Sequence, residues 1–109
     1  SDQQHGDERR ALDEIMTRLR TLVQETGIAL VVVSHLRRPE GKGHEEGAAT
    51  SLSQLRGSAS IGQLSDMVIG LERDAQNDDP IVRNTTRVRV LKNRFSDTGR
   101  LTEVKIDDL

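Results

Sequence analysis

The fold is decided by residues 27–35, with the sequence GIALVVVSH, in a chain of 109 residues. Residues 28–33 are apolar without alternation, and four of these six residues are β-branched. A short, uniformly apolar run of this kind is typical of a strand that is buried on both faces. The sequence therefore predicts a buried strand over 28–33, followed at once by the polar pair Ser34 and His35.

The segment before this strand has helical periodicity. We expect a loop over 1–6 and an amphipathic helix over 7–26, with Asp7 at its start and Gly27 at its C-terminal cap. Apolar residues recur there at intervals of three and four, at Ala11, Leu12, Ile15, Met16, Leu19, Leu22 and Val23. Helix, glycine and buried strand form the unit of an α/β layer with a parallel sheet.

The segment after the strand is a long polar loop followed by short elements. We expect, in order, a loop over 34–53, a short helix over 52–65 broken at Gly57 and Gly62, a buried strand over 67–71, an acidic turn over 74–80, and strands over 86–91 and 101–106. The turn at 96–99, with the sequence SDTG, predicts a β-hairpin between the last two strands.

Composition limits the class of protein. A hydrophobic content of 33% with a single aromatic, Phe95, predicts a core that is completed by residues outside these 109, although a small helical or partly disordered protein has similar figures. The absence of cysteine excludes disulfides and thiolate metal sites. The longest apolar run, 28–33, is too short for a signal peptide or a membrane span, so we expect a soluble intracellular protein.

His35 is placed where an α/β protein binds ligands, beyond the carboxyl end of a predicted parallel strand. Its imidazole can donate a hydrogen bond to a phosphate oxygen. The loop attached to it could then move when the phosphate leaves, as a switch element does. The alternative is a half-buried histidine that caps the strand.

Cations gather in the loop that follows His35. Arg37, Arg38, Lys42 and His44 alternate there with glutamates on a glycine-rich backbone. Because the net charge of −2 gives no overall attraction to nucleic acid, binding to a phosphate chain must come from such local clusters. No aromatic is available for base stacking, so we expect contacts with the phosphate backbone without sequence readout. The alternative is an ordinary solvated loop.

Two further segments suit anions. Residues 55–60, with the sequence LRGSAS, place small residues before a predicted helix, where exposed amides favour a phosphate; a tight helical turn is the alternative. Lys92 and Arg94 are separated by one residue at the end of a predicted strand, so both could face one side and bind a terminal phosphate. They could equally be solvated charges at a sheet edge.

Together these segments resemble the carboxy-terminal motor domain of DnaB-like replicative helicases, of the phage primase–helicase and Twinkle type. The resemblance runs from about residue 7 to residue 106. It is carried by VVVSHL (31–36), GHEEG (43–47), LRGS (55–58), QLSD (63–66), LER (71–73), LKNRF (91–95) and DTG (97–99). It implies that residues 1–109 form the C-terminal portion of one RecA-like P-loop NTPase domain. The implied fold is α/β, with a mostly parallel sheet, flanking helices and a C-terminal β-hairpin.

The resemblance implies a ring, usually a hexamer, that binds nucleotide between subunits and single-stranded DNA in its channel. His35 matches the γ-phosphate sensor, and Gln63 matches a polar residue that couples the nucleotide to DNA. Arg94 matches the arginine finger that reaches a neighbour's nucleotide, Lys92 assists it, and Arg73 matches a residue that packs against the base. The implied DNA contacts are Arg37, Arg38 and Lys42 in one loop, and Arg56 and Gly57 in a second.

The family's nucleotide cradle is not in this sequence. No G-x-x-x-x-G-K-[ST] phosphate loop occurs, and the family's magnesium-binding aspartate and catalytic glutamate precede Asp7. ATP, or another NTP or dNTP, and its Mg²⁺ therefore need upstream residues, no metal ligand is assigned here, and we expect the isolated chain to lack ATPase activity. Ile106 stands where related phage enzymes carry an aromatic on the base, which leaves the nucleotide preference open. The cytoplasm of a bacterial or phage-infected cell is the expected location.

Two other interpretations share these residues. A RecA-like recombinase or a regulatory ATPase has the same fold and switch position but should lack the pair Lys92 and Arg94. A DNA-binding or assembly module without catalysis is the second alternative, and the sequence upstream of Ser1 distinguishes it from a motor.

Overall fold

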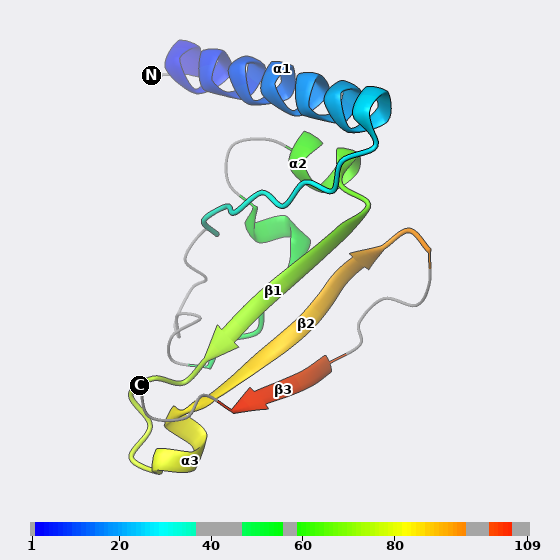
Figure 1. Cartoon of the computed structure of the whole chain (residues 1–109). Coiled ribbons are helices and arrows are strands. Elements are labelled where there is room, and N and C mark those ends of the chain that lie inside the picture. Colours follow the sequence, from blue (N-terminus) through cyan, green and yellow to red (C-terminus); the bar gives the residue numbers. More distant parts are fainter. Residues whose placement is uncertain (1, 37–46, 56–58, 96–100, 106–109) are drawn as a thin grey trace. The chain divides into compact units, whose positions relative to one another are not determined.

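The computed structural model describes residues 2–36, 47–55, 59–95 and 101–105 (Figure 1). The elements are, in order, α1 (Asp2–Thr26), the 3₁₀ turn η1 (Leu52–Gln54), α2 (Ser60–Leu64), β1 (Met67–Arg73), α3 (Pro80–Arg83), β2 (Thr85–Asn93) and β3 (Leu101–Lys105). They divide into two compact units. The first comprises the residues up to 36 together with 55–65, and the second comprises the remainder.

Helix α1 forms most of the first unit, and α2 is in contact with it. The helix begins at Asp2, so the loop predicted over 1–6 is wrong for 2–6, where polar residues continue the helix. The prediction of the C-terminal cap is confirmed. Gly27 adopts the left-handed conformation, with φ 72°, and its N–H donates to the Val23 carbonyl over 2.8 Å. Met16, on the predicted apolar stripe, is buried.

The prediction of a strand over 28–33 is wrong for this structure. These residues have no regular secondary structure, and the side chains of Val31 and Val33 are 88% and 91% exposed. The physical reason is that a strand needs a neighbouring strand for its N–H and C=O groups. Within the described residues no strand pairs with this segment. The isolated antiparallel bridge between Leu36 and Leu55 is the nearest ladder contact along the chain.

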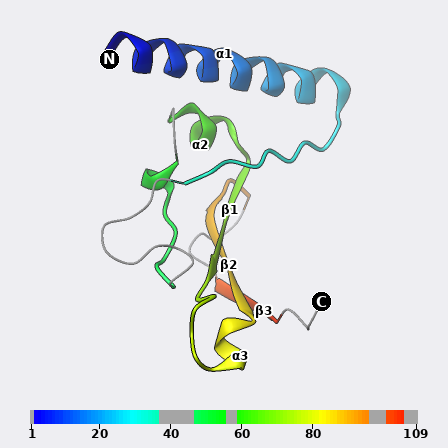
Figure 2. The same ribbon diagram turned by 90° about the vertical axis from the view of Figure 1, so that its left-hand side faces the viewer.

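A three-stranded sheet forms the centre of the second unit, in the order β1-β2-β3 (Figures 1 and 2). Both neighbouring pairs are antiparallel, so the mostly parallel sheet that was predicted is not found in the described residues. The predicted strands over 67–71, 86–91 and 101–106 are confirmed to within two residues at each end. The pairing of β2 with β3 confirms the predicted hairpin, whose turn at 96–99 lies outside the described residues.

The apolar sequence of β1 predicts burial on both faces, but the structure buries only one of them. Gly70 and Glu72 are buried, whereas Ile69 and Leu71 are exposed. The prediction of a strand buried on both faces is therefore wrong. Side chains alternate between faces along a strand, so one face of β1 carries the buried charge and the other carries the exposed apolar residues.

The connections hold two short helices. The acidic turn predicted over 74–80 is confirmed and leads into α3, where Asp79 caps the helix by accepting a hydrogen bond from the Ile81 N–H over 3.0 Å. The helix predicted over 52–65 is replaced by η1 and α2. Gly62 lies inside α2, so the predicted break there is wrong, and Gly57 lies outside the described residues.

Among the described helices, none is long and apolar enough to cross a lipid bilayer.

Candidate functional site

The predicted nucleotide residues are distributed over both units. His35 and Gln63 belong to the first unit, and both are exposed. His35 follows the unpaired segment 28–33, so no described sheet edge carries it, and its role as a phosphate sensor stays a prediction. The predicted DNA contacts Arg37, Arg38, Lys42, Arg56 and Gly57 lie outside the described residues.

Arg73, Lys92 and Arg94 belong to the second unit, where the sheet sets their spacing. Lys92 pairs with Val68 inside β2, and Arg94 follows the last residue of that strand. That both cations face one side of the sheet therefore stays a prediction. Arg73, at the far end of β1, is five residues from Val68, which corresponds to about 17 Å along a strand.

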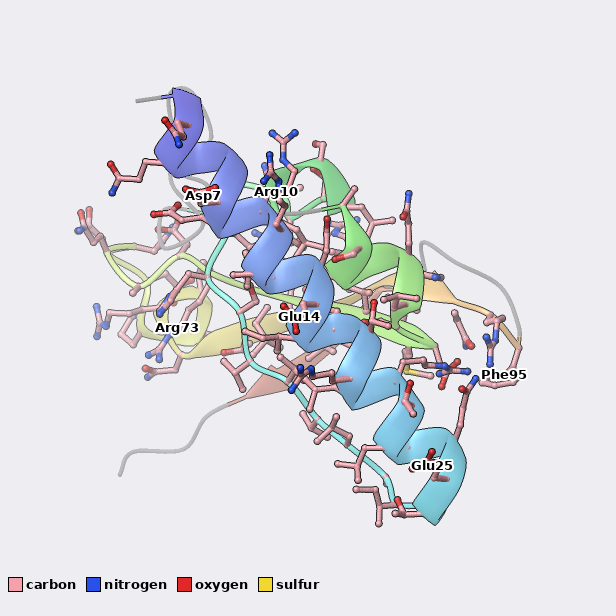
Figure 3. All side chains as sticks on the ribbon, turned by 90° about the horizontal axis from the view of Figure 1, so that it is seen from above. Asp7, Arg10, Glu14, Glu25, Arg73 and Phe95 are labelled. Carbon is pink, nitrogen blue, oxygen red and sulfur yellow. The ribbon has the colours of Figure 1, made fainter. Side chains whose placement is uncertain are left out.

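Arg73 and Arg94 therefore lie at opposite ends of the β1–β2 ladder. Figure 3 shows the same separation for the two labelled side chains Arg73 and Phe95, of which Phe95 neighbours Arg94. Arg73 cross-links β1 to the end of α3. Its Nε donates to the Arg83 carbonyl over 2.6 Å, and its Nη2 donates to the Asn84 Oδ1 over 3.3 Å. Two guanidinium groups this far apart cannot contact the same phosphate.

Arg94 is held at the other end of the ladder. Its Nη2 lies 2.6 Å from Oδ1 of Asp66, and its guanidinium carbon lies 5.4 Å from the centroid of the Phe95 ring. Its backbone N–H also donates to the Asp66 carbonyl over 3.0 Å. The side chain of Arg94 is 53% exposed, so a group outside the sheet can reach its cationic end.

A buried charge network on β1 was not predicted from the sequence. Glu72 is 1% exposed, and its Oε2 accepts hydrogen bonds from the N–H and the hydroxyl of Thr50, over 2.8 and 2.9 Å. Arg89 donates to both carboxylate oxygens, from Nε over 2.7 Å and from Nη2 over 3.2 Å. A carboxylate removed from water needs such partners, because an unpaired buried charge is strongly unfavourable.

These contacts set the ionisation of the pair. Burial by itself raises the pKa of Glu72, but the hydrogen bonds from Arg89 and Thr50 outweigh it and lower the pKa from 4.5 to about 2. The hydrogen bond to Glu72 raises the pKa of Arg89 above its ordinary value. Both groups are therefore charged at neutral pH.

The network anchors the segment that follows the predicted DNA-binding loop. Thr50 is held by Glu72, and the carbonyl of Gly47 accepts a hydrogen bond from Nη2 of Arg87 over 3.2 Å. Nε of Arg87 also lies 3.9 Å from Oε1 of Glu72. Gly47 has φ 97°, a left-handed conformation that glycine adopts without strain. The backbone from 47 to 50 is therefore fixed to β1 and β2 by side chains of the sheet.

A signal for this network was present in the sequence. Arg87 and Arg89 are two residues apart, a spacing that places both side chains on one face of a strand. The neighbouring strand contains one acidic residue, Glu72. A pair of cations at this spacing opposite a carboxylate in an apolar strand indicates a buried cluster.

Metal ligands are not gathered in the part of the chain described here. Among residues 2–36, 47–55, 59–95 and 101–105, no group of three or more His, Cys, Asp or Glu side chains could hold a metal ion.

Comparison with known proteins identifies the relatives of this chain. Residues 1–107 match the family described as the DnaB-like helicase C terminal domain. The chain is also 50% identical over 98 residues to a protein of Enterobacteria phage T3 named DNA helicase/primase. This match covers 88% of the chain and 17% of the T3 protein, so the chain spans about a sixth of the length of that relative.

Proposed function

The chain belongs to the DnaB-like helicase C-terminal domain family, and we propose on this basis that it is part of a ring-shaped replicative DNA helicase. The complete protein hydrolyses NTP at subunit interfaces, moves along single-stranded DNA and separates the strands of a duplex. The observation that carries this proposal is the family match over 1–107, together with the 50% identity to the T3 helicase/primase. The RecA-like fold and the hexameric ring are part of the same proposal.

Nucleotide binding needs residues that this chain does not supply. We infer that ATP, or another NTP or dNTP, is cradled together with Mg²⁺ by a phosphate loop and acidic residues elsewhere in the protein. Mg²⁺ held by those acidic residues would neutralise negative charge during phosphoryl transfer. The residues of this chain act on the terminal phosphate and on the base: they sense the phosphate, orient the base and stabilise negative charge.

Arg94 is the residue of this chain that we assign to the stabilisation of charge. Its half-exposed guanidinium stands just past the end of β2, where a phosphate bound by another subunit can approach it. Negative charge accumulates on the phosphate oxygens as the terminal phosphoryl group is transferred, and a fixed cation lowers the energy of that state. Lys92, two residues earlier, adds positive charge at the same end of the sheet.

Arg73 serves a different part of a nucleotide. Because it lies about 17 Å along the ladder from the residue opposite Lys92, it cannot share a phosphate with Arg94. Its hydrogen bonds to the Arg83 carbonyl and to Asn84 hold the plane of the guanidinium, as packing against a flat base requires. The two ends of the sheet would then contact different nucleotides, one bound by the same subunit and one by its neighbour.

His35 and the cations that follow it couple the nucleotide to DNA. We propose that the imidazole binds the terminal phosphate and that Arg37, Arg38 and Lys42, with Arg56 and Gly57 in a second loop, contact the DNA backbone. The anchoring of residues 47–50 by Glu72 and Arg87 supports this assignment, because it gives the end of the first loop a fixed attachment.

The test is unwinding of a forked duplex by the complete protein. We expect Arg94→Ala to lower the DNA-stimulated NTP hydrolysis by about 10³-fold, the lower end of the effect of an arginine finger, and to abolish unwinding. Arg18→Ala is a matched control, since Arg18 is an exposed arginine on α1 that is likewise paired with a carboxylate, Glu14, over 2.8 Å.

The alternatives give different results in the same assays. A recombinase exchanges strands but does not unwind the fork, and a DNA-binding or assembly module binds DNA but hydrolyses no nucleotide. Wild-type rates of hydrolysis and unwinding in the Arg94→Ala protein would refute the role of Arg94, and a complete wild-type protein that does not unwind the fork would refute the motor assignment.

A further inference from the structure

Two chain segments are joined where the ladder of β1 and β2 ends. Asp66 immediately precedes β1 and Arg94 immediately follows β2, and the first pair of the ladder joins Met67 to Asn93. The backbone N–H of Arg94 donates to the Asp66 carbonyl over 3.0 Å, which extends the pairing by one residue. The backbone of Arg94 is therefore fixed relative to the sheet even though the residue lies outside the strand.

The side chains repeat the connection made by the backbone. Nη2 of Arg94 lies 2.6 Å from Oδ1 of Asp66, so the two side chains form an ion pair. The guanidinium also lies over the ring of Phe95, 5.4 Å from its centroid. Asp66 thus fixes the direction of the arginine, and Phe95 borders the guanidinium.

This arrangement contributes little to the stability of the fold. The side chains of Arg94 and Asp66 are 53% and 36% exposed, and ion pairs with this degree of solvent contact stabilise a protein by at most about 1 kcal/mol. The Phe95 ring is 74% exposed, so it is not part of a core. The pair is therefore better explained by the placement of the cation than by stability.

We propose that Asp66 is a positioning residue that holds the Arg94 guanidinium in the orientation from which it reaches a phosphate of the neighbouring subunit's nucleotide. An arginine free in solvent samples many rotamers, and restricting them before the nucleotide arrives reduces the entropy lost in the transition state. The proposal rests on the proposed function, because it requires Arg94 to act as the finger.

The experiment is a double-mutant cycle on NTP hydrolysis by the complete protein with saturating single-stranded DNA. Its members are the wild type, Asp66→Ala, Arg94→Ala and the double variant. Asp66→Asn is added because it keeps the size and polarity of the side chain but removes its charge. Asp7→Ala is the matched control, since Asp7 also forms an exposed pair with an arginine, Arg10, over 4.0 Å.

We expect Asp66→Ala to lower kcat by about 10- to 100-fold without changing the KM for the nucleotide, because a misplaced group fails in the transition state. Asp66→Asn should recover part of this loss. In the double variant, loss of Asp66 should have no further effect beyond that of Arg94→Ala, because Asp66 acts through Arg94. The midpoint of thermal unfolding should not change in Asp66→Ala or in Asp7→Ala.

Three results would overturn the assignment. One is an unchanged or increased kcat in Asp66→Ala, which would mean that the carboxylate does not orient the arginine or that it restrains it. Another is a double variant slower than Arg94→Ala by the full factor of Asp66→Ala, which indicates two independent effects. The third is a fall in the unfolding midpoint of Asp66→Ala and Asp66→Asn in proportion to the lost rate, which indicates a structural pair.

Failure of the proposed function gives a different pattern. If Arg94→Ala hydrolyses NTP at the wild-type rate, Arg94 is not the finger, and the function of the site is wrong whatever Asp66 does. If Arg94→Ala is inactive and Asp66→Ala is fully active, only the positioning role is refuted.

Discussion

Replacing Glu72 by glutamine should destabilise the sheet of the second unit more than any other single carboxylate-to-amide change in the described residues. The substitution preserves the shape of the side chain but removes its charge. It also places an NH₂ group where an oxygen now accepts hydrogen bonds from Arg89 or Thr50. A donor then faces a donor, and the cation of Arg89 loses its partner.

The size of the effect follows from the ionisation of Glu72. Lowering its pKa from 4.5 to about 2 corresponds to about 3 kcal/mol of stabilisation of the charged form in the folded state. Breaking a buried ion pair by removing one partner typically costs about 3–5 kcal/mol, which agrees in magnitude. Thr50→Val, which removes only the hydroxyl donor, should cost about 1 kcal/mol.

Hydrogen exchange of backbone amides in the complete protein measures this locally. The amides of β1 and β2 exchange when the sheet opens, so about 3 kcal/mol corresponds to a loss of protection of about 100-fold in Glu72→Gln. Glu103→Gln is the matched control, because Glu103 is an exposed glutamate on β3 of the same sheet. Its protection should change by less than about 0.5 kcal/mol. Equal protection in the two variants would refute the reasoning.

Three further predictions concern the same unit and the first helix. Lowering the pH should remove the contribution of ionised Glu72 to the stability of the sheet, which is fully present above about pH 4.5 and is lost as the pH falls through about 2. Amide protection of the sheet in the wild type should therefore fall over this pH range, and Glu72→Gln should not show this fall. Gly70→Ala should lower the amide protection of the sheet by about 2 kcal/mol, because the new Cβ would lie 2.7 Å from the Thr50 Cβ. Gly6→Ala in α1 is the control, because its new Cβ meets nothing within 4 Å, and it should be neutral or stabilising. Gly27→Ala should lower the free energy of opening of the last turn of α1 by about 1 kcal/mol, because φ 72° is unfavourable for alanine. The amides of that turn should then exchange faster, and an unchanged exchange rate would contradict this prediction.

The sequence predicted local structure well where local forces decide it. The helical stripe ending at Gly27, the turn capped by Asp79 and the strands near 67, 86 and 101 all follow from periodicity and capping, which act over a few residues. The strand over 28–33 could not be decided in this way. An apolar run becomes a strand only when another strand offers hydrogen bonds, and in the described residues none does so.

The candidate site was predictable in part for a similar reason. Family motifs pointed to Arg94 and Arg73, but the partners of these residues depend on which strands pair and in which direction. The antiparallel register places Asp66 beside Arg94 and sets Arg73 at the far end of the ladder. Neither relation follows from spacing along the chain. Glu72 was missed because its partner Arg89 is 17 residues away in the sequence, and the pairing of β1 with β2 brings the two together.

The buried carboxylate restricts how homologous sequences can vary at this sheet. A lone change at position 72 leaves a guanidinium without a counter-charge, and a lone change at position 89 leaves an anion that water cannot reach. Substitution is tolerated only when both positions change together, either by exchange of their signs or by a pair of well-packed apolar residues. In related sequences, positions 72 and 89 should therefore change together, and position 50 should vary freely in sequences that lack an acidic residue at position 72.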